Sequence, residues 1–187
     1  MDNSQIVVGS LGQIASRDNM SLADVFMNCD HIILVDTSGS MHEKDSTGGR
    51  SRYEVACDEL RKIQRDLPGK LGIFSYSDEC VFCPNGIPTM LGQGTGMLDA
   101  MRYVEPVDGT IKSYIIISDG YPDPGTENNI LALAGRMSTP VNTIFAGGVE
   151  DKMGREFMNQ LAIAGRGKTS FSASASDLSS SAMKLLR

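Results

Sequence analysis

The stretch HIILV at residues 31–35 runs directly into DTSGS at residues 36–40, and this junction decides the expected fold. The first segment is rich in β-branched and apolar residues, as expected of a strand that is covered on both sides. The second segment consists of short polar residues and a glycine, which end a strand and form a loop. We therefore expect a buried strand with a polar loop at its carboxyl end.

Strand and helix patterns alternate after this junction. Helix 51–67 shows the logic, because apolar residues recur on one face, Ser51 can cap the first turn, and Pro68-Gly69 ends it. The same reasoning predicts strands at 71–76, 81–82, 114–117, 141–146 and 169–172, and helices at 97–104, 127–137, 155–164 and 177–186.

Repeated β-α alternation predicts an α/β fold in three layers. It is expected to be a Rossmann-like, doubly wound and mainly parallel sheet with helices on both faces. The short link 77–79 joins two strands as a hairpin, which places one antiparallel strand at an edge. Residues 1–28 do not show this alternation of strands and helices. We therefore expect an N-terminal extension with a turn of helix at 21–27, followed by one domain at 29–187.

Charge and hydropathy exclude two classes of partner. The net charge of −6 over 187 residues argues against a nucleic-acid surface, which needs clustered Lys and Arg. The longest apolar runs are too short to cross a bilayer. The first residues lack a basic region followed by an apolar core, so no secretory signal is expected. We expect a cytoplasmic protein with no membrane partner.

The four cysteines fit that compartment, where disulfides are rare. Cys80 and Cys83 have the spacing of a redox or metal-binding pair. They lie in a strand-like segment, however, where residues three apart point to opposite faces. No second pair follows, and the motif does not open a helix. We expect both to be structural, together with Cys29 and Cys57.

Three polar loops are expected at one edge of the sheet, since ligands of open α/β sheets bind beyond the carboxyl ends of the strands. Residues 36–40 follow the first strand, residues 118–120 follow strand 114–117, and Gly94-Thr95-Gly96 precedes a helix. Together the loops offer two carboxylates and three hydroxyls, which are hard oxygen donors. Mg²⁺ keeps several waters and needs few protein ligands, so we expect Mg²⁺, with Mn²⁺ or Ca²⁺ as alternatives. With two carboxylates balancing its charge, such an ion stays electrophilic and can accept one more carboxylate from outside.

The pattern Asp36-x-Ser38-x-Ser40, Thr95 in a glycine-rich loop and Asp119 in Ser-Asp-Gly resembles the metal-ion-dependent adhesion site of von Willebrand factor A domains. The resemblance implies that Ser38 and Ser40 coordinate the metal directly, that Thr95 joins in one conformation, and that Asp36 and Asp119 act largely through waters. It also implies a central first strand.

The function implied by the resemblance is protein binding through an Asp or Glu that a partner offers to the metal. An intracellular adaptor without enzyme activity is expected. Some related bacterial domains work beside AAA+ ATPases or in stress and defence systems, which suggests that class of partner. Glu43 and Asp45 are candidates for a second ion, although a solvated loop is favoured there. Asp123 is expected to serve the turn at 122–125.

An enzyme remains the alternative, because a bound metal can polarise a substrate. A metal-dependent hydrolase acting on a phosphorylated substrate would fit the donor set, but no His is placed to activate a nucleophile. Residues 165–169 resemble a phosphate-binding loop only in part, since Ala162 stands where a glycine is required and the order of strand and helix is reversed. Gly92 and Gly94 lack the third glycine of a dinucleotide fingerprint.

Overall fold

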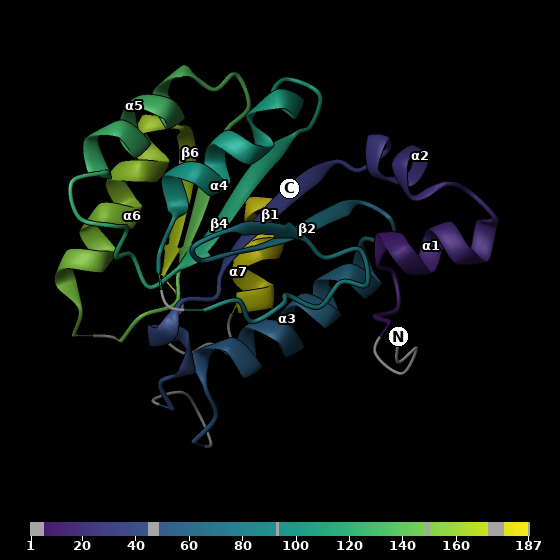
Figure 1. Cartoon of the computed structure of the whole chain (residues 1–187), viewed down its shortest axis with the longest axis horizontal. Helices are drawn as coiled ribbons and strands as arrows, with labels where there is room; N and C mark the ends of the chain where they lie inside the picture. The colour runs from purple at the N-terminus through teal and green to yellow at the C-terminus, as the bar shows by residue number, and fades with distance from the viewer. Residues whose placement is uncertain (1–5, 45–48, 93, 149, 172–177, 187) are drawn as a thin grey trace.

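The computed structural model describes residues 6–44, 49–92, 94–148, 150–171 and 178–186. Its centre is one six-stranded sheet with the strand order β3-β2-β1-β4-β5-β6 (Figure 1). The strands are β1 (His31–Asp36), β2 (Leu71–Tyr76), β3 (Cys80–Phe82), β4 (Ser113–Ser118), β5 (Val141–Phe145) and β6 (Arg166–Phe171). All neighbouring pairs are parallel except β2 and β3, which form the predicted antiparallel edge.

Helices cover both faces of this sheet, as the Rossmann-like prediction requires. One face carries α3 (Arg52–Asp66) and α7 (Leu178–Leu185), and the other carries α4 (Met97–Val104), α5 (Glu127–Arg136) and α6 (Lys152–Ala164) (Figure 1). Two short 3-10 turns, η2 (Gly39–His42) and η3 (Glu105–Val107), complete the connections. None of the described helices combines the length and hydropathy needed to span a bilayer.

Strand β1 explains why the sheet has two apolar sides. Ile32 and Leu34 pack with the α4–α6 layer, whereas Ile33 and Val35 pack with α3 and α7. Every residue of β1 is buried, because β2 and β4 pair with its two edges and helices cover its two faces. The expected continuous apolar strand is therefore the central strand of the sheet.

The N-terminal segment contains two helices, α1 (Leu11–Asp18) and α2 (Leu22–Met27). Helix α2 matches the expected turn of helix, whereas α1 was not expected. The Ser10 side chain caps α1, and the Gly12 N–H donates to the Pro84 carbonyl 2.8 Å away. The Val7 N–H likewise donates to the Asn85 carbonyl at 3.0 Å, so this segment is tied to the loop after β3.

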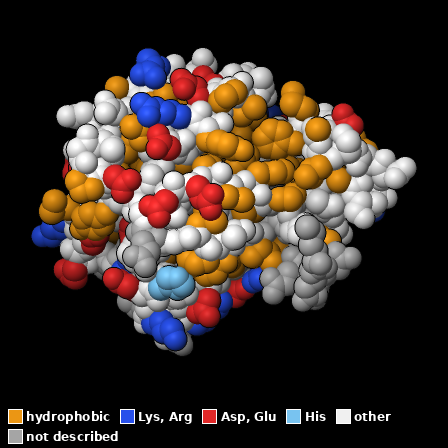
Figure 2. Space-filling view, viewed as in Figure 1, with side chains coloured by type: hydrophobic (Ala, Val, Ile, Leu, Met, Phe, Trp, Pro, Cys, Tyr) orange, Lys and Arg blue, Asp and Glu red, His pale blue; other side chains and the backbone are white. Residues whose placement is uncertain are grey.

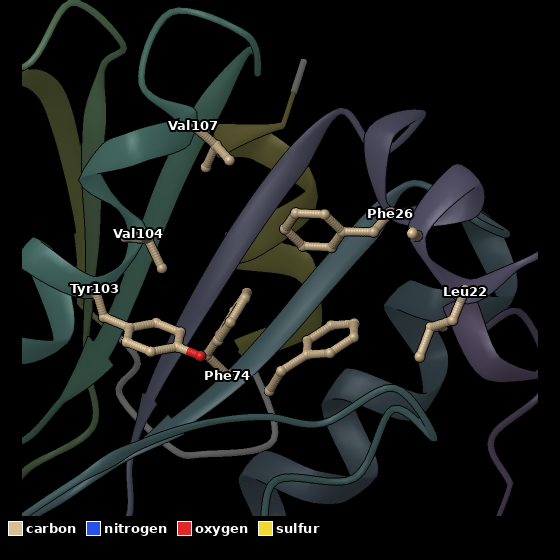
Figure 3. Close-up of a pocket in the computed structure, with 8 residues that line it drawn as sticks. Leu22, Phe26, Phe74, Tyr103, Val104 and Val107 are labelled. Carbon is tan, nitrogen blue, oxygen red and sulfur yellow. The ribbon is translucent and has the colours of Figure 1, made fainter.

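An apolar groove opens between α2 and α4, and hydrophobic side chains gather there in Figure 2. Its cavity has a volume of about 430 Å³. Phe74 and Phe82 come from the sheet, and their ring centroids lie 5.1 Å apart. Phe26 of α2 packs edge-on against both rings, and Tyr103 of α4 closes the other side (Figure 3).

Two elements begin three residues earlier than the sequence predicts, and the other boundaries differ by one residue at most. Helix α6 begins at Lys152 rather than 155, because the Asp151 side chain accepts the Gly154 N–H and caps the earlier start. Strand β6 begins at Arg166 rather than 169, helped by the Lys168 N–H bond to Asn142 Oδ1. The glycine- and lysine-containing segment at 165–169 therefore enters a strand that follows a helix, which agrees with rejecting a phosphate-binding loop.

The expected placement of Cys80 and Cys83 on opposite faces of the sheet is confirmed. Cys80 packs on the α4–α6 side of the sheet, while Cys83 is buried on the α3–α7 side. All four cysteines, Cys29 and Cys57 included, are free thiols. Burial raises the pKa of Cys80 to about 12, so the protonated thiol is favoured at neutral pH.

Candidate metal centre

The candidate site lies where the strand order reverses. The chain moves from β1 outward to β2, but β4 sits on the opposite side of β1 and starts the second half of the sheet. Asp36 is the last residue of β1 and Ser118 is the last residue of β4, so their loops leave side by side. Ligands of doubly wound sheets bind at this kind of crevice.

Asp36 is fully buried, and hydrogen bonds fix both of its carboxylate oxygens. Oδ1 accepts the Ser38 N–H at 2.9 Å, and Oδ2 accepts the Ser118 hydroxyl at 2.7 Å. Burial raises the pKa of Asp36 to about 6, and the charge of Asp119 adds to the rise, although the bonds from Ser38 and Ser118 oppose it. A nearby cation would therefore stabilise the ionised form of this carboxylate.

Ser38 and Ser40 present their hydroxyls together. Ser38 Oγ and Ser40 Oγ are 3.2 Å apart, and Ser38 is 2 % exposed while Ser40 is half-buried. The turn η2 produces this pairing, and it is anchored by Met41, which points into the core and is fully buried. The Thr37 N–H and hydroxyl both donate to the Tyr76 carbonyl, which ties the loop to the end of β2.

Thr95 is held beside the same edge from two directions. The N–H of the next residue, Gly96, donates to the Ser77 carbonyl at 2.7 Å, just beyond β2. The Thr95 N–H itself donates to Asp123 Oδ1 at 3.2 Å, in the loop that follows Asp119. Thr95 therefore lies between the loops after β2 and β4, and Asp123 does more than form the turn expected at 122–125.

Asp119 is 2 % exposed, and its carboxylate is paired with a positively charged side chain of the protein. Arg52, the first residue of α3, donates from Nη1 to Asp119 Oδ2 at 3.2 Å. Its Nη2 donates to Glu43 Oε2 at 2.9 Å, and its N–H donates to the Glu43 carbonyl. Glu43 is thus engaged with Arg52 rather than only with solvent, whereas Asp45, the other candidate for a second ion, lies outside the described residues.

The loop after Asp119 is shaped by contact with α6. Gly120 has a φ of +89°, and a Cβ placed there would lie 2.3 Å from the Gly154 carbonyl oxygen. A Cβ at Gly154 would in turn lie 2.3 Å from the Asp119 carbonyl oxygen. The Tyr121 hydroxyl donates to Asp151 Oδ1 at 2.6 Å. These contacts fix the direction in which Asp119 leaves β4.

The donor set fits a hydrated divalent ion. Among the described residues no three His, Cys, Asp or Glu side chains cluster as ligands, so such an ion would rest on two carboxylates and on hydroxyls. Two further hydroxyls at the end of β2, those of Tyr76 and Ser77, are buried and make no hydrogen bond of normal geometry within the described part of the chain. Hard oxygens and spare hydroxyls suit Mg²⁺ or Mn²⁺ with its waters.

Sequence reasoning named the five candidate ligands but missed the residues around them. The structure brings Asp36, Ser38 and Ser40 together at the end of β1 and sets Asp119 at the end of the neighbouring β4. Thr95 is held between the loops that follow β2 and β4. Arg52 was missed because its contact with Asp119 spans 67 residues of sequence. Ser118 was visible as the neighbour of Asp119, but its bond to Asp36 depends on strand order.

Comparisons place this geometry among known folds. No family model matches the sequence, and no curated protein matches it. Solved structures do. An aerotolerance-related membrane protein from Bacteroides fragilis, with multiple mutations to serines, is similar with a TM-score of 0.67 at 15 % identity, covering 85 % of this chain and 98 % of that chain.

Two further structures extend the likeness. The SpRpn10 VWA domain has a TM-score of 0.61 at 17 % identity, covering 80 % of this chain and 93 % of its own. Manganese-loaded TRAP protein from Plasmodium vivax has a TM-score of 0.59 at 16 % identity, covering 85 % of this chain and 72 % of its own. At sequence identities this low, the similarity supports a shared fold and nothing more. With its central β1, its antiparallel edge strand and helices on both faces, this chain has the fold of von Willebrand factor A (VWA) domains.

Proposed function

We propose that this protein is a metal-dependent protein-interaction module. Asp36, Ser38, Ser40, Thr95 and Asp119 hold a divalent cation, Mg²⁺ in the first instance. The bound cation supplies an electrophilic position that takes an Asp or Glu carboxylate from a partner protein. The chain acts as a cytoplasmic adaptor, and its four free thiols are consistent with a reducing compartment.

The observation that carries the proposal is the pair of hydroxyls 3.2 Å apart in the same loop as a buried carboxylate. Turn and capping residues do not require this arrangement, because the N–H bond from Ser38 to Asp36 would suffice for the turn. The Ser40 hydroxyl is not needed for that turn, yet it lies within hydrogen-bond distance of the Ser38 hydroxyl. One fold neighbour is described as manganese-loaded, which supports a divalent ion in this fold.

Titration calorimetry with Mn²⁺ and Mg²⁺ tests the metal. We expect one ion per chain for the natural sequence and no binding for Ser38→Ala or Asp36→Ala. Asp99→Asn is the matched control, because Asp99 is an exposed acid on α4 that forms an ion pair with Arg102, away from the candidate ligands. Absence of binding to the natural sequence at millimolar metal would contradict the proposal.

The open coordination position has its own test. A carboxylate that binds there displaces a metal-bound water, so the water-proton relaxation caused by protein-bound Mn²⁺ should fall when acetate is added. Acetamide, which has the same shape and no charge, serves as the control. Equal effects of the two compounds would contradict carboxylate capture.

A hydrolase acting on phosphorylated substrates is the outcome to exclude. His31 bonds to Ser113 Oγ at the opposite end of β1 and β4. His42 is exposed at the end of η2, and no hydrogen bond joins it to a candidate ligand in the described part of the chain. Mg²⁺-dependent turnover of a generic phosphoester that is abolished by Asp119→Asn would show that the protein is a hydrolase and would contradict the proposal.

For the partner, we propose an AAA+ ATPase or another component of a bacterial stress or defence system. Capture of this partner should be abolished by EDTA and by Thr95→Ala.

A further inference from the structure

Arg52 is the only basic side chain that the structure places in direct contact with a candidate metal ligand among the described residues. Its side chain is 9 % exposed, and its guanidinium reaches Asp119 Oδ2 at 3.2 Å and Glu43 Oε2 at 2.9 Å. Asp119 is itself almost fully buried, whereas the Glu43 side chain is 59 % exposed. The guanidinium therefore joins the buried site to its rim.

This contact has an electrostatic consequence. A buried carboxylate needs a positive partner, because removal from water is costly for an isolated charge. In the metal site Asp119 has two possible partners, the divalent ion and Arg52. A cation that binds Asp119 is repelled by the fixed positive charge of Arg52, and the repulsion is strong in a poorly solvated environment.

We propose that Arg52 sets the metal affinity of this site by competing with the cation for the Asp119 carboxylate. The inference rests on the proposed metal-binding function and adds a residue to it. Arg52 balances the charge of Asp119 in the metal-free protein, which keeps the carboxylate in place. The same charge weakens metal binding, so that the site loads only at higher metal concentration than its five oxygen donors alone would require.

Two substitutions separate charge from hydrogen bonding. Arg52→Gln keeps an amide donor near Asp119 but removes the positive charge, so the Kd for Mn²⁺ and Mg²⁺ should fall at least about tenfold. Arg52→Lys keeps the charge and should remain within about twofold of the natural sequence. Arg50→Gln is the matched control, because Arg50 lies two residues away and pairs with the half-buried Asp58 outside the site.

The measurement is calorimetric titration at pH 8, where protons compete little for carboxylates, together with thermal unfolding in EDTA. The metal-free Tm should fall for Arg52→Gln and change little for Arg50→Gln. An unchanged or weaker metal affinity in Arg52→Gln, with normal binding by the natural sequence, would overturn the role of Arg52 and leave the metal site intact. If the natural sequence binds no metal, the proposed function itself fails.

A second measurement follows Arg52 directly in the unmutated protein. The side-chain Nε–H resonance of Arg52 in a ¹H–¹⁵N spectrum should move on addition of Mg²⁺, while that of Arg50 stays in place. The Arg52→Lys spectrum assigns the peak. An Arg52 resonance unaffected by saturating Mg²⁺ would show that the guanidinium and the ion do not share Asp119.

Discussion

Gly120 and Gly154 meet where the loop after β4 passes the first turn of α6, and neither position has room for a methyl group. This contact carries no chemistry. It decides where the Asp119 main chain runs, and through it where the carboxylate lies. At the residue scale the site therefore depends on backbone approach as much as on its ligands.

Gly154→Ala tests this constraint. The new Cβ would lie 2.3 Å from the Asp119 carbonyl oxygen, so the loop has to shift. We expect a loss of about 1–3 kcal/mol in the free energy of unfolding and weaker metal binding. Urea unfolding and calorimetry measure the two effects.

The matched control is Gly135→Ala in α5, where the nearest atom is the Ala164 carbonyl oxygen at 3.8 Å. This substitution is expected to raise stability by about 0.5–1 kcal/mol, because alanine favours a helix more than glycine does. Equal effects of the two substitutions would contradict the packing argument.

Helix α3 is positioned at its start, where Arg52 must reach Asp119. Ser51 and Glu54 form a capping box: the Ser51 hydroxyl accepts the Glu54 N–H, and the Glu54 carboxylate accepts the Ser51 N–H. This arrangement satisfies two N–H groups that a helix leaves without partners. The cap therefore fixes the residue from which the Arg52 side chain extends.

Ser51→Ala should lower the free energy of unfolding by about 1 kcal/mol, because the Glu54 N–H loses its acceptor. Ser51→Thr keeps the hydroxyl and is expected to retain most of the stability. Chemical unfolding followed by circular dichroism distinguishes them. A threonine variant as weak as the alanine variant would point to packing of Ser51 rather than to capping.

Asp108 fastens the segment before β4 to the turn before β5. Its oxygens accept the Ser138 N–H at 2.6 Å and the Thr139 N–H at 2.9 Å. Burial alone would raise the pKa of Asp108, but these backbone hydrogen bonds outweigh it and the pKa lies below its ordinary value. The bonds favour the ionised form, which is the form present at neutral pH.

The sign of the pH effect follows from that depressed pKa. The contribution of Asp108 to stability is present above the unfolded-state pKa, near 4, and is lost as the pH falls through the lower folded-state pKa. The Asp108→Asn variant should therefore have a lower Tm than the natural sequence at pH 7. The difference between the two Tm values should become smaller below pH 4. A gap that stays constant between pH 7 and pH 3 would contradict this assignment.

Much of the fold was predictable because its signals are local. The apolar run at 31–35, the capping residue Ser51 and the turn at Pro68-Gly69 each act within a few residues. Helix α1 was missed since it buries only Leu11 and has a largely polar sequence; what holds it is its contact with the loop after β3. The candidate ligand set was visible as a motif, whereas Arg52 depended on a long-range contact.

At the scale of the whole molecule, the candidate site joins loops that follow three strands, β1, β2 and β4. An ion bound there contacts only the folded chain, so it should stabilise the whole domain against unfolding. Saturating Mg²⁺ at about 100 times Kd adds about 2.7 kcal/mol, and each kcal/mol raises the Tm of a domain of this size by roughly 2–4 °C.

Differential scanning calorimetry in Mg²⁺ and in EDTA measures this shift. Ser38→Ala should retain a normal EDTA melting curve but show no rise with Mg²⁺. A rise of equal size in that variant would mean that the ion stabilises the protein from elsewhere.

The central position of β1 also has a consequence for synthesis. Asp36 meets Ser118, its hydrogen-bond partner, 82 residues further along the chain. At about 5–20 residues per second a ribosome needs roughly 4–16 s to make that segment. During this interval the edge of β1 that later pairs with β4 has no partner strand. The nascent chain therefore exposes a hydrophobic strand edge to chaperones and to other nascent chains. Ribosome-bound chains halted before residue 118 should therefore fail to retain Mn²⁺, and retention should begin only after β4 has left the exit tunnel.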